Sequence, residues 1–102
     1  MPFGIKEYQL NKIKKILLHY PGIHDAVLFG SRAKGINKKG ADIDIALKGE
    51  NLTVNDIITL QQKLEELWLP YKFDLILYHN IDEPSLTEHI KRVGVSLFDK
   101  DF

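Results

Sequence analysis

Three aspartates are the residues whose type and spacing suggest chemistry in this chain. Asp42 and Asp44 stand two residues apart in a stretch of strictly alternating apolar and polar positions, and Asp74 lies in a second apolar stretch with the same period. Residues two apart on a β-strand point to the same face, with Cα atoms about 6.6–6.8 Å apart. Carboxylates held in that way repel one another unless a cation lies between them. Magnesium fits this role because it prefers hard oxygen ligands and is usually held by one or two carboxylates together with substrate phosphates.

The third carboxylate extends this prediction to a pair of metal ions. Asp74 occupies the polar parity of a later predicted strand, and neighbouring strands lie about 4.8 Å apart. All three aspartates can then converge on two Mg²⁺ ions, with Mn²⁺ as the alternative ion. Such a pair stabilises both the attacking and the leaving oxygen of an in-line phosphoryl displacement.

A basic segment upstream supplies the complementary charge. Gly30 and Ser31 end a predicted strand, and no acidic residue lies between positions 26 and 41, a stretch that also holds Arg32, Lys34, Lys38 and Lys39. A glycine lets phosphate approach the backbone, and the N–H groups at a helix start bind anions. We therefore predict that Gly30, Ser31, Arg32 and Lys34 bind a nucleoside triphosphate. For Arg32 and Lys34, a solvent-facing or salt-bridged role is an equal alternative.

The elements that must position these residues follow from periodicity and from start and stop signals. Thr53 and Asp56 form a capping-box pattern at the start of one helix, Pro70 ends that helix, and Trp68 is expected to pack near its end. The expected elements are a helix at 5–20, a strand at 26–29, a helical turn at 31–34, a loop at 36–40, a strand at 41–48, a helix from 53, a strand at 72–78, a helix from Pro84 to about Arg92 and a short edge strand at 95–98. This order predicts an α+β fold, a small mixed β-sheet with helices packed on one face and the other face open for chemistry.

Composition narrows the class of protein. The chain has 102 residues, which predicts a single domain over 1–102, and its 14 basic and 14 acidic residues cancel, so general nucleic-acid binding is not expected. It has no cysteine, which excludes a disulfide framework and a thiolate metal site. No apolar run approaches the roughly 20 residues that cross a bilayer, and we expect a cytoplasmic protein without membrane contact. The four histidines show no metal-binding spacing and are expected to serve ordinary packing.

The motif residues also carry a resemblance. The run from Leu28 to Gly35, followed by Asp42-Ile43-Asp44-Ile45, resembles the signature of the minimal nucleotidyltransferases of the DNA polymerase beta superfamily. The resemblance implies a polymerase beta-like fold in which Gly30 and Ser31 hold the triphosphate and Asp42 and Asp44 ligate both metals. Asp74 would ligate one metal and help to deprotonate the attacking hydroxyl. Ala41 stands where the family often has serine, and Lys34 where many members have arginine, so a bidentate phosphate contact becomes a point-charge contact.

The same resemblance implies a partner. Stand-alone members often pair with a HEPN-domain toxin, and the nucleotidyltransferase then acts as the antitoxin by transferring AMP from ATP to a hydroxyl of the toxin. Either a hetero-oligomer or a homodimer fits this reading. The alternative is a non-catalytic, nucleotide-binding antitoxin that acts by protein–protein contact, which the three intact aspartates disfavour. Transfer to a small molecule or to an RNA end is a third hypothesis.

Overall fold

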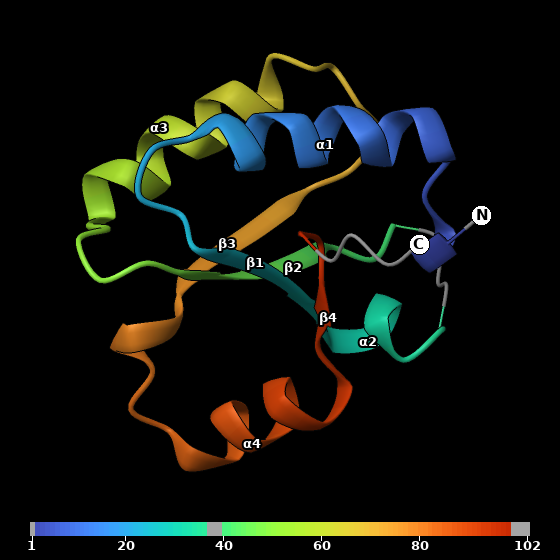
Figure 1. The fold of residues 1–102 in the computed structure, drawn as a ribbon. Helices are drawn as coiled ribbons and strands as arrows, with labels where there is room; N and C mark the ends of the chain where they lie inside the picture. The colour runs from blue at the N-terminus through green and yellow to red at the C-terminus, as the bar shows by residue number, and fades with distance from the viewer. Residues whose placement is uncertain (1, 37–39, 99–102) are drawn as a thin grey trace.

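The computed structural model describes residues 2–36 and 40–98, which form a four-stranded mixed sheet flanked by helices (Figure 1). The strands are β1 (Asp25–Phe29), β2 (Ile43–Lys48), β3 (Phe73–Leu77) and β4 (Val95–Ser96), in the order β3-β2-β1-β4. The helices are α1 (Glu7–His19), α2 (Gly30–Ala33), α3 (Val54–Glu65) and α4 (Pro84–Val93), with short 3-10 turns at η1 (Pro2–Gly4) and η2 (Tyr78–Asn80). The predicted α+β class with a mixed sheet is confirmed.

The sheet owes its mixed character to two kinds of connection. β1 pairs antiparallel with β2 and with β4, whereas β2 pairs parallel with β3. A parallel pair requires a crossover, and α3 supplies it between β2 and β3. The capping box predicted for α3 is present, and the Thr53 N–H donates to Oδ2 of Asp56 at 2.7 Å. Tyr20 donates to the other carboxylate oxygen of Asp56 at 2.6 Å, which ties the end of α1 to the start of α3.

The main core lies between the sheet and the layer of α1 and α3. Odd-numbered positions of β2, such as Ile45 and Leu47, are fully buried there against Leu17 and Leu60 from the two helices. The helix stripes predicted for these segments are therefore the faces that pack on the sheet. This layer fixes the strand register, because a slip by one residue would turn the apolar positions of β2 to the opposite face.

The prediction that the helices pack on one face is wrong for α4. Figure 1 places α4 on the face opposite α1 and α3, and Ile90 of α4 packs there with Val27, Phe29 and Ala46. The cause is an apolar stripe on α4 that needs a second apolar surface, which β1 supplies because its residues are buried on both faces. The second face of the sheet is therefore partly covered.

Two further predictions concern Trp68 and the loop at 36–40. Trp68 was expected to pack near the end of α3, but it is 90% exposed with a positive φ of 54°, so that prediction is wrong. The helix ends at Glu65, and the chain turns away before the indole can reach the core. Residues 37–39 of the predicted loop at 36–40, including Lys38 and Lys39, lie outside the described residues. No helix in the described ranges is long and apolar enough to span a membrane.

Candidate active site

The sheet register brings two of the three predicted aspartates together. Asp44 of β2 and Asp74 of β3 are direct partners in the parallel pair, so their side chains leave the same face of neighbouring strands. This is the face of the sheet on which α4 packs. The two aspartates lie there beyond the end of a small apolar cluster, which consists of Val27, Phe29, Ala46 and Ile90. Asp42 lies just before β2 rather than inside it, two residues from Asp44. The observed strand therefore begins at Ile43, two residues later than predicted.

The electrostatics of Asp44 reflect this crowding. Its pKa is raised to about 6, first because the carboxylate is partly buried and then because Asp74 and Asp42 repel its charge. The guanidinium of Arg32 acts in the opposite direction but does not outweigh these effects. Asp42 and Asp74 themselves are exposed. The three carboxylates therefore interact, and a proton or a cation at Asp44 would relieve the repulsion.

Gly30 forms a tight corner directly beside Asp44. Phe29, the last residue of β1, is the register partner of Asp44, and the chain then turns into α2 at Gly30 with a positive φ of 78°. A Cβ on Gly30 would overlap Oδ2 of Asp44. Glycine therefore suits both the left-handed backbone and the close approach of the carboxylate. Ser31 follows within α2, partly exposed at the same corner.

Arg32 turns away from this corner and holds the backbone instead. Its Nε and Nη2 donate to the carbonyl of Ala41 at 3.1 and 2.8 Å, and Nη1 donates to the carbonyl of Phe3 at 2.8 Å. The side chain is 5% exposed, and its guanidinium lies 5.2 Å from the ring centre of Tyr71. A triphosphate could reach this guanidinium only if these contacts broke. Arg32 therefore orients the segment before Asp42, and the predicted phosphate contact belongs more readily to exposed Lys34.

His89 is a member of this site that the sequence reasoning missed. Its Nε2 accepts a hydrogen bond from the Gly30 N–H at 3.2 Å, and its ring meets Phe29 edge to face with centroids 6.2 Å apart. The signal was present in the sequence, because His89 lies three residues after Leu86 and directly before Ile90 on the buried stripe of α4. Because the sequence predicts that all helices pack on one face of the sheet, it does not predict the contact between His89 and Gly30.

The residues present suit a metal of the magnesium type without forming a closed cage. Within residues 2–36 and 40–98, no group of three or more His, Cys, Asp or Glu side chains is placed so that it could hold a metal ion by itself. The donors at hand are carboxylate oxygens, from Asp42 and Asp44 at alternate positions of the chain and from Asp74 on the neighbouring strand. Magnesium sites of this kind keep waters and are completed by substrate phosphates. The donor set therefore fits an ion that arrives with its nucleotide.

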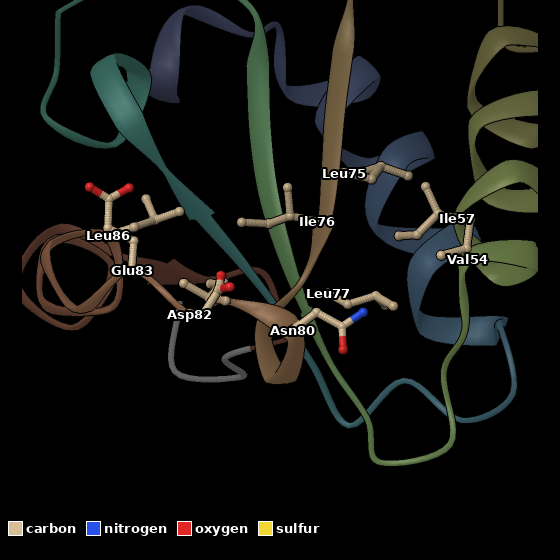
Figure 2. Close-up of a pocket in the computed structure, with 10 residues that line it drawn as sticks. Val54, Ile57, Leu75, Ile76, Leu77, Asn80, Asp82, Glu83 and Leu86 are labelled. Atoms are coloured by element: carbon tan, nitrogen blue, oxygen red, sulfur yellow. The ribbon is translucent and has the colours of Figure 1, made fainter.

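A cavity of about 440 Å³ lies beside the far end of β3. Figure 2 shows side chains from α3, β3 and the start of α4 around it. Its wall is mainly apolar and its rim is acidic or amide, as the lining residues Val54, Ile57, Leu75, Ile76, Leu77, Asn80, Ile81, Asp82, Glu83 and Leu86 indicate. None of the predicted site residues lines this cavity, although Asp74 lies on β3, which forms part of its wall.

Comparison with known proteins shows the family of this chain. The family model described as polymerase beta, nucleotidyltransferase, matches residues 11–102. This chain belongs to the polymerase beta nucleotidyltransferase family. The predicted fold family and enzyme class are thereby confirmed.

Relatives of this nucleotidyltransferase include a candidate protein adenylyltransferase of Methanocaldococcus jannaschii. The two sequences are 34% identical over 93 residues, which cover 86% of this chain and 97% of the relative.

Solved structures share the fold at lower identity. A chain from a toxin–antitoxin crystal structure with AMP-PNP superposes with a TM-score of 0.73 at 28% identity, over 90% of this chain and 74% of that chain. A chain from the structure of a tri-AMPylated Shewanella oneidensis HEPN toxin in complex with its MNT antitoxin gives a TM-score of 0.69 at 26% identity, over 92% and 72% of the two chains.

Proposed function

We propose that this nucleotidyltransferase transfers AMP from ATP to a hydroxyl group of a HEPN-family partner protein and acts as the antitoxin of the pair. The observation that carries the proposal is the register pairing of Asp44 with Asp74 beside the Gly30 corner. Support for a protein acceptor comes from the relatives, of which one is named for protein adenylyltransfer and another derives from a complex with an AMPylated HEPN toxin. The proposal treats residues 1–102 as one domain that acts in the cytoplasm.

Each residue of the site has a distinct part in this reaction. Gly30 and Ser31 receive the triphosphate at the end of β1, and exposed Lys34 offers it a positive charge. Asp42 and Asp44 would hold two Mg²⁺ ions, and Asp74 would bind one of them. Bound magnesium supplies stabilisation of the charge on the phosphoryl, attacking and leaving oxygens.

The transfer itself forms one bond and breaks one. The acceptor oxygen bonds to the α-phosphorus of ATP while the bond to the β-phosphate oxygen breaks, so pyrophosphate leaves. The proton of the acceptor hydroxyl passes to Asp74, whose exposed carboxylate stands on the edge strand of the sheet. The open side of β3 thus gives a large acceptor access to the reacting atoms.

The test is transfer of label from ATP to the partner. We expect the purified chain, incubated with ATP labelled at the α-phosphate, Mg²⁺ and its HEPN-family partner, to label the partner. Asp42→Asn with Asp44→Asn should abolish labelling. Asp82→Asn changes an exposed aspartate at the rim of the β3 cavity, serves as the control and should leave labelling unchanged.

The double variant also separates catalysis from contact. A partner that stays neutralised by Asp42→Asn with Asp44→Asn, without any label, would favour the non-catalytic antitoxin that binds nucleotide and acts by contact. Wild-type protein that labels no partner with Mg²⁺ or Mn²⁺ would contradict the transfer reaction.

A further inference from the structure

We propose that His89 is a positioning residue for nucleotide binding, which holds the Gly30 corner in its binding conformation through the Gly30 N–H. The inference rests on the proposed function, because it concerns the site that receives the triphosphate. His89 reaches that site from α4, 59 residues further along the chain. It touches the corner and not the reacting atoms, so its effect on transfer is indirect.

The geometry of the ring makes it a fixed acceptor. The Gly30 N–H donates to Nε2 at 3.2 Å, so Nε2 carries the lone pair and the neutral ring bears its proton on Nδ1. The edge of the ring packs against Phe29 with an interplanar angle of 80°. Ile90, the next residue, is 3% exposed and anchors α4 against β1. Backbone, ring contact and helix packing together leave the imidazole little freedom.

Burial and charge favour the same neutral form. The pKa of His89 is lowered from its usual value, first by burial and then by the positive charges of Lys34 and Arg92. A protonated ring could not accept the Gly30 N–H, because both its nitrogens would be donors. The surroundings of His89 thus preserve the acceptor that the corner needs.

Gly30 needs such an external hold because of its own chemistry. Glycine reaches many backbone conformations, so a left-handed glycine is not kept in place by its side chain. In this site the carboxylate of Asp44 lies on one side of Gly30 and the imidazole of His89 takes its N–H. Helix α2, which begins at Gly30, spans only four residues and cannot fix the corner alone.

One consequence concerns which groups bind phosphate. Because the Gly30 N–H is engaged by His89, the contribution of Gly30 is its shape and its missing Cβ rather than its amide. The hydroxyl of Ser31 and the ammonium of Lys34 are then the groups that meet the triphosphate. Loss of the His89 acceptor would free the Gly30 amide and let the corner, and Ser31 with it, leave this conformation.

The test compares variants that keep the ring with variants that keep the acceptor. His89→Phe retains a ring against Phe29 but removes Nε2, and His89→Gln offers a side-chain oxygen near the same position. Binding of AMP-PNP with Mg²⁺ is measured by titration calorimetry, and the folded state is checked by thermal unfolding. We expect His89→Phe to weaken the affinity about two- to tenfold, the scale of one lost hydrogen bond. His89→Gln should recover most of it.

A matched control and a kinetic readout distinguish positioning from general stability. His79→Phe changes an exposed histidine after β3 and should leave affinity unchanged. In transfer assays, His89→Phe should raise KM for ATP more than it lowers kcat, whereas a merely destabilised protein would lose active fraction with KM unchanged. If His89→Phe does not fold, His89→Met replaces it as the variant without this acceptor.

The outcomes separate this inference from the function on which it rests. Wild-type protein that binds no AMP-PNP overturns the proposed function and this inference with it. Wild-type binding, together with folded His89→Phe protein of equal affinity, overturns the role of His89 alone. Failure of His89→Gln to improve on His89→Phe has the same meaning, because the hydrogen-bond acceptor would then not matter.

Discussion

The two faces of the sheet differ in how completely they are covered. Within residues 2–36 and 40–98, the face under α1 and α3 buries a cluster of fifteen apolar residues, whereas the face under α4 buries a cluster of four. Strand β2 contributes to both faces. Ile43, Ile45 and Leu47 of β2 enter the large core, and the alternate positions supply Asp44 and Ala46 to the other face. The comparison shows that stability and the candidate chemistry occupy opposite parities of the same strand.

The comparison predicts that the partly covered face can be inactivated without unfolding the protein. Asp74→Asn should lower the transfer rate at least about a hundredfold, the scale of removing one preorganised electrostatic group, because the acceptor proton loses its base. Binding of Mg²⁺ and AMP-PNP should persist, since Asp42 and Asp44 remain. Rates from labelled ATP and affinities from calorimetry check both expectations. A variant with wild-type rate would remove Asp74 from the site.

The fully covered face should respond in the opposite way. Leu60 of α3 is fully buried, so Leu60→Ala should lower the free energy of unfolding by about 2–5 kcal/mol. The residual folded protein should keep its KM for ATP. Leu86→Ala, at a half-buried position on α4, should cost less. Urea unfolding measures both, and an equal loss for the two variants would contradict the difference between the layers.

A pair of glycines tests how closely the corner fits Asp44. Both Gly30 and Gly35 have positive φ, 78° and 82°, so an added Cβ strains either by about 1–3 kcal/mol. A Cβ at Gly35 meets nothing within 4 Å, whereas one at Gly30 overlaps Oδ2 of Asp44. Gly30→Ala should therefore be the less stable variant in thermal unfolding, and it alone should lose transfer. Equal behaviour of the two would mean that the contact with Asp44 is easily relieved.

The crowded carboxylates predict a specific dependence of stability on pH. The pKa of Asp44 is about 6 in the folded, metal-free protein and near 3.9 when unfolded, so the folded state binds more protons between these values. The contribution of Asp44 to stability is therefore full below about pH 4 and is lost as the pH rises through about 6. Asp44→Asn should remove this part of the pH dependence. The midpoint of urea unfolding, followed from pH 4 to 8 without Mg²⁺, measures it, and parallel profiles for the two proteins would argue against the raised pKa.

The smallest effect is expected at the exposed end of the covered layer. Trp68 is 90% exposed, so Trp68→Ala should change the free energy of unfolding by no more than about 0.5 kcal/mol. Urea unfolding of the variant checks this value. A loss of several times that size would mean that the indole packs against the protein in solution.

Local sequence signals predicted most of the fold. The alternation in residues 41–48 and the capping box at Thr53 act over a few residues, and the strand and the helix start appear close to where they were expected. Helix α3 ends at Glu65, ahead of the predicted stop at Pro70. The pairing of Asp44 with Asp74 needed one further step, a parallel neighbour for β2.

Contacts between distant segments could not be predicted in that way. The hydrogen-bond partners of His89 and Arg32 can be identified only once the positions of α4 and Phe3 in the fold are known. Whether an apolar stripe packs on one face or the other depends on which surface is still free after the other helices have packed. For this reason the side of the sheet on which α4 packs could not be predicted, and neither could the exposure of Trp68.

The guanidinium of Arg32 joins two parts of the chain that are far apart in sequence. By donating hydrogen bonds to the carbonyls of Phe3 and Ala41, it ties the 3-10 turn η1 to the peptide before Asp42. Displacement of η1 would therefore change the position of Asp42 without altering any residue of the site. A change at Phe3 that breaks this hydrogen bond should therefore lower activity even when all three aspartates are intact.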